Sequence, residues 1–384
     1  MEKLIYLDNA ATTPLAPEVL DTMLPYMQQH FGNPSSAYAL GRNSKSAIEA
    51  ARKKVGEILG VKASTLYFTS GGTEANNTAI ASAVNELGCS HIITSAIEHH
   101  AVLHTVEHYC HAKNMTFSFV KLTSQGEVDY ADLEKQLTIQ ASQGKKCLVS
   151  LMHANNEIGS LLDIALVGQL CRANGALFHS DCVQTVGHYP IDFKACGLHF
   201  ASAAGHKFHG PKGTGLLYVS DEIKAYPLIF GGSQERKVRA GTENVYGIVG
   251  FAKALELATD SYAQESEYIS GLKRFMMEEF RKAIPGVSFN NPENSLYTVL
   301  SVCFPTAEPS DFLVTLFDMK GVCVSGGSAC SSGDSGSHVI NALGKGEGFS
   351  TLRFSFSKYN TREEIAKAID IATGIFEKSG VATA

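Results

Sequence analysis

Two lysines, Lys207 and Lys212, lie within a run of glycines and small residues that extends from Ser202 to Gly215. Glycine lets a backbone approach a bound group closely, and a partly desolvated lysine can keep a neutral amine that attacks a carbonyl carbon. A Schiff base to pyridoxal phosphate (PLP) requires such a lysine, and the ring nitrogen of this cofactor needs a carboxylate partner. Asp181, which ends a strand-like run, could be that partner. Taken alone, the run is more typical of a surface turn with two solvated lysines, and it does not distinguish Lys207 from Lys212.

Three further polar groups each follow a predicted strand. Residues 70–74 (Ser-Gly-Gly-Thr-Glu) precede a predicted helix, whose free N–H groups could bind a phosphate, and a simple N-cap turn is the alternative. His99 could stack on a flat ring and exchange protons, or it could be an ordinary loop histidine, one of 14 in the chain. Asn155 and Asn156 could donate to a ring hydroxyl or form an Asx turn. Since the carboxyl ends of parallel strands share one edge of a sheet, these groups and Asp181 together predict a single cofactor site.

Two residues near the C-terminus could act on a substrate. Cys330 lies in a Gly/Ser-rich segment, where an exposed thiol can act as a nucleophile that moves between a buried substrate and an external acceptor. An incidental cysteine in a linker is the alternative. Arg353 lies in an apolar strand-like run, where a substrate α-carboxylate would suit its fork and an internal salt bridge is the alternative. We interpret the other cysteines as structural, namely Cys89, Cys110, Cys147, Cys171, Cys182, Cys196, Cys303 and Cys323.

The elements that position these residues alternate between strand-like and helix-like runs. The predicted strands from 66 to 219 are separated by helical patterns, which favours an α/β fold with a mostly parallel sheet covered on both faces. After about residue 245 the pattern changes to a long helical stretch and then to short strands. This second pattern predicts an α+β domain of about 130 residues. Its expected strands lie at 287–289, 298–304, 322–325 and 351–356, and its expected helices at 261–284, 310–320 and 362–378.

The composition excludes several classes of protein. The chain has 384 residues, 44% hydrophobic and 18% charged, which is typical of a globular protein of about two domains. A net charge of −6 without a basic run argues against nucleic-acid binding. No apolar run reaches the roughly 18 residues that cross a bilayer, and the N-terminus does not resemble a signal peptide. Nine cysteines without a Cys-x-x-Cys pair argue against disulfides or a zinc ribbon. We therefore expect a cytoplasmic protein with no membrane, nucleic-acid or metal partner.

Eight groups of residues, in chain order, resemble the motifs of the NifS/IscS-type cysteine desulfurases. This family belongs to the class V aminotransferase group and has the fold type I architecture of PLP enzymes. The resemblance covers nearly the whole chain. The groups are YLDNAATTP at 6–14, FGNP at 31–34, TSGGTE at 69–74, EH at 98–99, NNExG at 155–159, GHKxxGPKG at 205–213, RxGT at 239–242 and SAC at 328–330.

The resemblance implies a fold and a reaction. A large domain at 15–255 would contain a mostly parallel seven-stranded sheet between helices, and a small α+β domain would comprise 1–14 and 256–384 and carry the Cys330 loop. The chain would be a sulfurtransferase that uses PLP to convert L-cysteine to L-alanine, with the sulfur transferred to Cys330 as a persulfide. A selenocysteine lyase or a class V aminotransferase on the same fold is the alternative.

The resemblance also assigns roles to residues. Lys207 would form the Schiff base, His99 would stack on the ring and act in acid–base steps, and Cys330 would accept the sulfur. Substrate binding would fall to Asn9, Asn33 and Arg353. The implied cofactor-binding residues are Gly72, Thr73, His99, Asn156, Asp181, Gln184, His206, Lys207 and Thr242.

The implied partners are a second copy of the chain and a sulfur acceptor. Thr242 would reach the phosphate of the neighbouring subunit in a homodimer. The acceptor could be an iron–sulfur scaffold or another protein. The chain ends soon after its last predicted helix, without the extension that the IscS type uses for its scaffold, so we expect a NifS-like member that serves another acceptor. Ala204 stands where the family usually has a serine whose hydroxyl helps to bind the phosphate.

Overall fold

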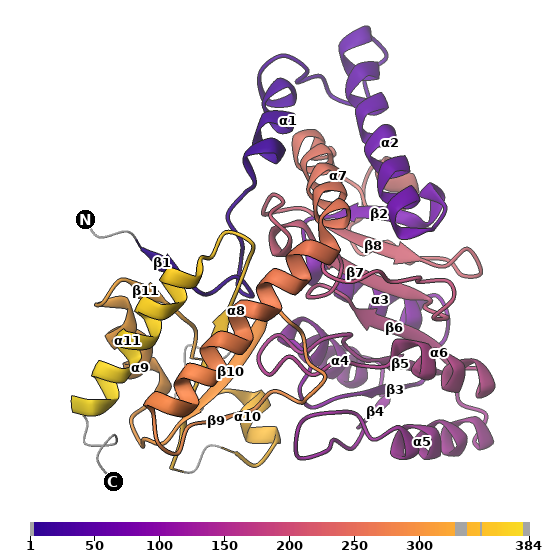
Figure 1. Ribbon diagram of the computed structural model, residues 1–384. Coiled ribbons are helices and arrows are strands. Elements are labelled where there is room, and N and C mark those ends of the chain that lie inside the picture. The colour runs from indigo at the N-terminus through magenta and orange to yellow at the C-terminus, as the bar shows by residue number, and fades with distance from the viewer. Residues whose placement is uncertain (1–3, 327–335, 346–347, 379–384) are drawn as a thin grey trace.

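The computed structural model describes residues 4–326, 336–345 and 348–378. Its largest sheet has seven strands in the order β2-β8-β7-β6-β5-β3-β4. β8 runs antiparallel to β2 and β7, and the other neighbours are parallel. The predicted mostly parallel seven-stranded sheet is therefore confirmed (Figure 1). The strands are β2 (Leu66–Thr69), β3 (His91–Thr94), β4 (Thr116–Phe119), β5 (Cys147–Ser150), β6 (Leu177–Asp181), β7 (Phe200–Ala204) and β8 (Gly215–Val219).

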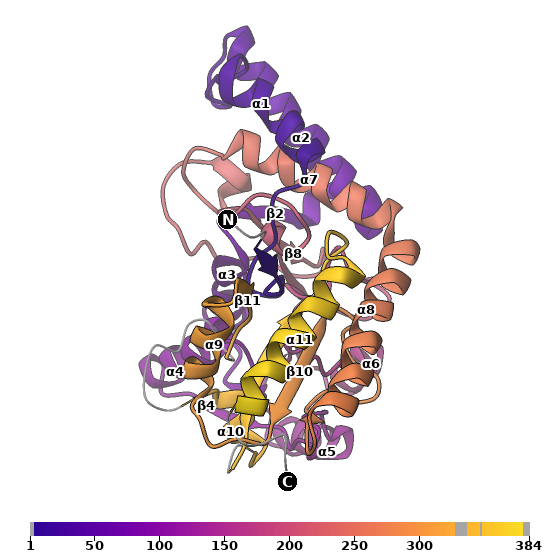
Figure 2. The same cartoon turned by 60° about the vertical axis from the view of Figure 1, so that its left-hand side comes forward.

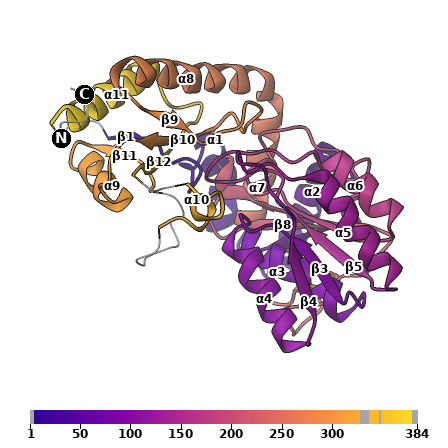
Figure 3. The same cartoon turned by 90° about the horizontal axis from the view of Figure 1, so that it is seen from below.

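Helices cover both faces of this sheet, as Figure 3 shows from below. Alternate apolar residues of one strand point to opposite faces: in β5, Leu148 packs with α3 and α4, whereas Val149 packs in the core shared with α5, α6 and α7. The central strands are thus buried on both sides. The helices are α1 (Pro17–Gln28), α2 (Ala39–Leu59), α3 (Gly72–Asn85), α4 (His100–Ala112), α5 (Tyr130–Ser142), α6 (Ile164–Ala173) and α7 (Val245–Asp260).

A second apolar core lies between a small antiparallel sheet and the C-terminal helices (Figure 2). Its sheet has the order β12-β10-β9, and Phe280, Phe304 and Phe354 are fully buried beside it. A separate parallel pair joins β1 (Ile5–Tyr6) to β11 (Val322–Cys323), so the N-terminal segment belongs to this core. The remaining elements are α8 (Tyr262–Ala283), β9 (Ser288–Phe289), β10 (Val299–Phe304), α9 (Ser310–Asp318), α10 (His338–Ala342), β12 (Ser350–Ser355) and α11 (Arg362–Lys378).

The two apolar cores support the proposed division into a large domain at 15–255 and a small domain at 1–14 and 256–384. Short 3-10 turns also occur at Ala63–Thr65, Gly205–Lys207 and Gln234–Lys237. Over the ranges that the structure describes, no helix is both long and apolar enough to span a membrane. The same ranges contain no cluster of three or more His, Cys, Asp or Glu side chains suited to a metal ion.

Candidate active site

A pocket of about 270 Å³ opens at the carboxyl edge of the large sheet. Its wall includes the ends of β6 and β7, the first turn of α3, and the N-terminal residues Ala10 and Ala11. Arg353 of β12 completes the wall from the small sheet. The volume is close to the lower end of ligand sites, which is about 300 Å³. The predicted convergence of strand ends is therefore observed as one cavity.

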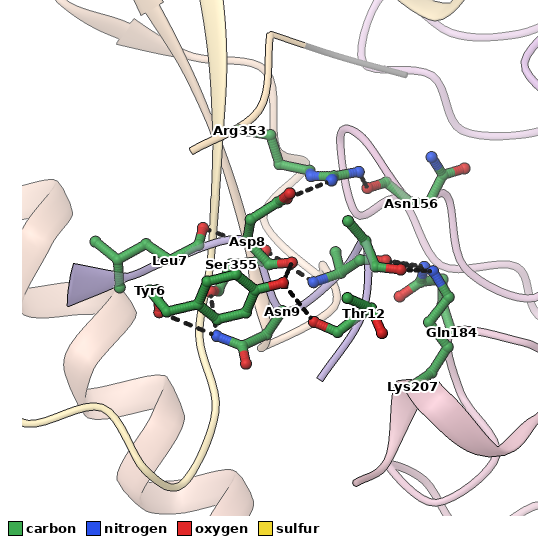
Figure 4. A network of polar contacts seen from close by, with 12 residues as sticks. Tyr6, Leu7, Asp8, Asn9, Thr12, Asn156, Gln184, Lys207, Arg353 and Ser355 are labelled. Carbon is green, nitrogen blue, oxygen red and sulfur yellow. Dashed lines mark hydrogen bonds and ion pairs between the residues drawn. The ribbon is translucent and has the colours of Figure 1, made fainter. Parts of the chain in front are cut away.

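Lys207 lies in the 3-10 turn that follows β7 and lines this pocket. Its Nζ donates to the carbonyl oxygens of Ala10 at 2.5 Å and Ala11 at 2.9 Å (Figure 4). Lys212, in contrast, is exposed to solvent. Only Lys207 can present its amine to a ligand in the pocket, so the structure distinguishes the two lysines.

Asp181 ends β6 and is held at both carboxylate oxygens. Oδ2 accepts from Asn76 Nδ2 at 2.6 Å, and Oδ1 accepts from the Val183 N–H at 2.9 Å. Asp181 is only 5% exposed and lines the pocket together with Lys207. It can therefore face a cationic ring nitrogen in a fixed orientation.

The N-terminus of α3 provides N–H groups for an anion. Gly71 is the N-cap residue, and no side chain caps this end of α3 in the described part of the chain. A Cβ atom on Gly72 would lie 2.5 Å from Val183 Cγ2, so any larger residue at this position would require the Val183 side chain to move. Gly72 and Thr73 line the pocket with His206, whose Nδ1 is 3.2 Å from Thr12 Oγ1. Burial and the neighbouring lysines lower the pKa of His206 to about 4, so its ring is neutral at pH 7.

A half-buried ion pair fixes the same turn. Arg239 Nε donates to Glu74 Oε1 at 3.0 Å, and the Ser70 N–H donates to Glu74 Oε2 at 2.8 Å. Burial and these hydrogen bonds act on Glu74 in opposite directions, and the net effect lowers the pKa of its carboxyl. Glu74 therefore ties the α3 turn to the segment that carries Thr242.

His99 is the N-cap residue of α4. Its Nδ1 accepts from the Ala101 N–H at 3.0 Å, which leaves Nε2 as the ring atom that carries the proton. Burial lowers the pKa of His99, against the opposing effect of Asp181. The pocket is thus lined by a neutral imidazole whose tautomer is set by the helix.

The two adjacent asparagines have different roles in the structure. Asn155 Oδ1 accepts from the N–H groups of Glu157 at 2.8 Å and Ile158 at 2.9 Å, which is the Asx turn that the sequence left open. Asn156 lines the pocket, as does Gln184, whose Nε2 donates to the Ala10 carbonyl at 3.1 Å.

Arg353 forms the internal salt bridge that was one of its two sequence-based interpretations, and it also lines the pocket. Its Nη2 lies 2.7 Å from Asp8 Oδ1, and its Nη1 donates to the Asn156 carbonyl at 2.9 Å (Figure 4). The guanidinium is nevertheless part of the pocket wall, and its buried Nε has no hydrogen-bond partner among the described residues. Asp8 and Asn156 therefore account for two of the five N–H groups that an arginine carries.

Four predicted residues lie outside this lining. Asn9 is buried, and its Nδ2 donates to the Ser355 carbonyl at 2.9 Å. Asn33 and Thr242 are both exposed, Asn33 in the loop between α1 and α2 and Thr242 just before α7. Cys330, like the rest of the SAC motif, lies outside the described residues.

Sequence reasoning missed Asn76, Met152 and the carbonyl groups of Ala10 and Ala11, which also line the pocket. Asn76 lies four residues after Gly72 on α3, so helical spacing places both residues on one face. That spacing is the one local signal that could have identified Asn76. Backbone carbonyls carry no signal in the sequence.

The residues present fit pyridoxal phosphate. The pocket combines a lysine amine, a buried carboxylate, a helix N-terminus without a side-chain cap, and Gly72, where an added Cβ would lie 2.5 Å from Val183 Cγ2. These are the groups that a carbonyl, a pyridine nitrogen and a phosphate require.

Comparison with known proteins agrees with this chemistry. Residues 5–367 match the family Aminotransferase class-V. The chain is 41% identical to a protein of Dictyoglomus turgidum named cysteine desulfurase IscS, over 98% of this chain and 96% of that protein. A solved structure called NIFS-like protein superposes with a TM-score of 0.89 at 34% identity, covering 98% of this chain and 100% of the other. A structure titled SspA in complex with cysteine gives a TM-score of 0.81 at 32% identity, covering 93% and 100%.

Proposed function

The chain belongs to the class V aminotransferases and, within them, to the cysteine desulfurases, and we propose that it converts L-cysteine to L-alanine and transfers the sulfur to Cys330. One observation carries the proposal: Lys207, Asp181 and the N-terminus of α3 line a single pocket in a chain that matches cysteine desulfurases over nearly its full length. Neither a selenocysteine lyase nor an aminotransferase is favoured by these relatives.

The cofactor would be held by residues of several elements. Gly72, Thr73 and His206 would bind the phosphate, and Asp181 would pair with the ring nitrogen. His99 would lie against the ring, and the ring hydroxyl would be bound by Asn156 and Gln184. When bound, pyridoxal phosphate supplies an electron sink that stabilises negative charge on the substrate's α-carbon.

Protons in the pocket would be handled by Lys207 and His99. The carbonyls of Ala10 and Ala11 hold the Lys207 amine at a fixed position, where it can attack a carbonyl or accept a proton at Nζ. The N–H of Ala101 occupies His99 Nδ1, so His99 holds its proton at Nε2. Lys207 Nζ and His99 Nε2 are therefore the two atoms at which a proton would be accepted or released.

The substrate carboxylate would bind Arg353. The Asp8 carboxylate and the Asn156 carbonyl take two of its N–H groups and fix the plane of the guanidinium. The remaining donors, including Nε, would form the fork that a carboxylate accepts. Asp8 thus orients Arg353 without using all of its donors.

The sulfur step balances without an external oxidant. The Cys330 thiolate attacks the substrate sulfur, the S–S bond of a persulfide forms, and the C–S bond of cysteine breaks. The β-carbon gains a hydrogen and is reduced, while the transferred sulfur is oxidised. The products are L-alanine and a persulfide on Cys330.

The proposed assembly is a homodimer. Thr242 and Asn33 lie exposed outside their own pocket, where they could serve a second copy of the chain. α1 and α2 extend away from the body of the molecule (Figure 1), and α1 exposes Leu20, Leu24 and Met27. Exposed apolar groups of this kind are typical of interfaces.

We also propose that the protein works in the cytoplasm and passes sulfur to an acceptor protein such as an iron–sulfur scaffold.

The proposal is tested by measuring alanine and sulfide released from L-cysteine in the presence of a thiol reductant. Wild type should release equal amounts of both. Cys330→Ala should lose this activity but keep the visible absorbance of the bound cofactor, and Cys196→Ala should behave as wild type. Cofactor-loaded wild type that releases neither product would refute the substrate assignment.

A further inference from the structure

A chain of buried hydrogen bonds lies behind Asp181. Asn76 Nδ2 donates to Asp181 Oδ2 at 2.6 Å, and Asn76 Oδ1 lies 3.1 Å from His179 Nε2. His179 Nδ1 lies 2.9 Å from Ser150 Oγ. Asn76, His179 and Ser150 are at most 1% exposed, so water cannot replace any of these contacts.

The elements of the fold bring these residues together. His179 and Asp181 are two residues apart on β6, so both side chains point to one face of the sheet. α3 packs on that face, where Leu177 joins the core formed by Ala75 and Ala79. Asn76 is thereby placed between His179 and Asp181.

The donors and acceptors of these residues permit only one direction for each hydrogen bond between Ser150 and Asp181. A carboxylate only accepts, so Asn76 must turn its NH₂ to Asp181 and its oxygen to His179. His179 Nε2 must then carry the proton, and Nδ1 must accept from the Ser150 hydroxyl. Burial lowers the pKa of His179 to about 4, which keeps the ring neutral as this arrangement requires. Each hydrogen bond in this series, from Ser150 through His179 and Asn76, is therefore donated in the direction of Asp181.

We propose that Asn76 and His179 are positioning residues that hold the Asp181 carboxylate in one orientation toward the cofactor's ring nitrogen. This inference rests on the proposed function. Without the His179 N–H, the Asn76 amide could rotate and present its oxygen to Asp181, where two acceptors would repel. A role in packing alone would not alter the cofactor's electronic state.

The test compares full-length His179→Leu, His179→Gln and Asn76→Ala with wild type, all loaded with pyridoxal phosphate. Glutamine keeps a donor near the position of Nε2, whereas leucine removes it. For His179→Leu and Asn76→Ala we expect cofactor affinity and kcat to fall about tenfold or more, as for a lost hydrogen bond to a charged group. KM for L-cysteine should change little. The pH midpoint of the cofactor's visible absorbance should rise. A ring nitrogen that binds its proton less tightly attracts less electron density from the Lys207 nitrogen, so the Lys207 nitrogen would keep its own proton to a higher pH. His179→Gln should restore most of each property.

A matched control is His91→Leu. His91 is a buried histidine of the same sheet, with hydroxyl partners Thr116 at 2.7 Å and Ser118 at 3.0 Å, and it lies outside the pocket lining. This variant should lower thermal stability without moving the absorbance midpoint.

The outcomes separate this inference from the proposed function. If His179→Leu and Asn76→Ala only lower the unfolding temperature, as His91→Leu does, and keep the cofactor affinity and absorbance midpoint of wild type, the positioning role is refuted. Wild type that binds the cofactor but does not desulfurise cysteine would refute the proposed function alone. Wild type that binds no pyridoxal phosphate would refute both.

Discussion

Asp8 Oδ1 and Arg353 Nη2 lie 2.7 Å apart, although the two residues are separated by nearly the whole chain. The pair forms because the segment after β1 bridges to Ser355 at the end of β12. The Arg353 side chain is only 3% exposed, so its orientation is set before any substrate arrives. The arginine proposed to bind the substrate is therefore part of a preformed ion pair.

Arg353→Lys should raise KM for L-cysteine about tenfold to a hundredfold, because an ammonium cannot reproduce the planar fork or its contacts with Asp8 and Asn156. The cofactor's visible absorbance should be retained, and steady-state kinetics would measure the change. Arg274→Lys, at an exposed position of α8, is the control. An unchanged KM in Arg353→Lys would remove Arg353 from substrate binding.

Ala204→Ser should strengthen cofactor binding. Ala204 lines the pocket, and the Ala204 Cβ lies 3.8 Å from the position of a Cβ on Gly72, so a serine hydroxyl would add one donor near the proposed phosphate position. A gain of about 1 kcal/mol corresponds to a roughly fivefold lower dissociation constant for pyridoxal phosphate. Ala195→Ser, at an exposed position, should have no effect on that constant. Weaker binding by Ala204→Ser would place the phosphate elsewhere.

Mixed dimers should reveal whether Thr242 serves the neighbouring pocket. Lys207→Ala should be inactive, and Thr242→Ala should bind the cofactor weakly. A heterodimer of the two variants would pair an intact Lys207 with an intact Thr242 from the other subunit, so one site should regain wild-type cofactor affinity. Co-expression with two different tags would isolate this species. If no site recovers, Thr242 acts within its own subunit or not at all.

Stability should decrease as the pH falls from about 6.5 to 4. Burial lowers the pKa values of His153, His179, His206 and His209 to about 4, below the ordinary 6.5. The unfolded chain therefore binds more protons than the folded chain in this range, and the free energy of unfolding drops. Urea unfolding of the cofactor-free protein at several pH values would measure the slope. His206→Gln should reduce the slope and exposed His108→Gln should not; a flat profile in wild type would contradict this account.

The sheet and most helices could be predicted because their patterns are local. Strand runs such as Cys147–Ser150 are apolar and short, and the helices between them have apolar residues at helical spacing. Helix α10 was not predicted, since it has only five residues and depends on distant contacts: Ser337 Oγ donates to Glu157, and Val339 packs on Ile97.

The candidate site was predictable only in part, for a similar reason. Lys207 and Lys212 lie in the same glycine-rich run, and Lys207 is distinguished by its contacts with Ala10 and Ala11, which lie almost 200 residues away. Asn9 belongs to the same N-terminal motif, yet its amide is used by the Ser355 carbonyl. Contacts between distant segments decide these placements, and no local pattern contains them.

The central claim is that sulfur from L-cysteine passes to Cys330. The most direct test is to mix cofactor-loaded protein with limiting L-cysteine, alkylate all thiols and locate any additional sulfur atom by peptide mass spectrometry. We predict one additional sulfur on the peptide that contains Cys330, in proportion to the alanine formed, and none in Cys330→Ser. Alanine formed while Cys330 carries no additional sulfur would contradict the account.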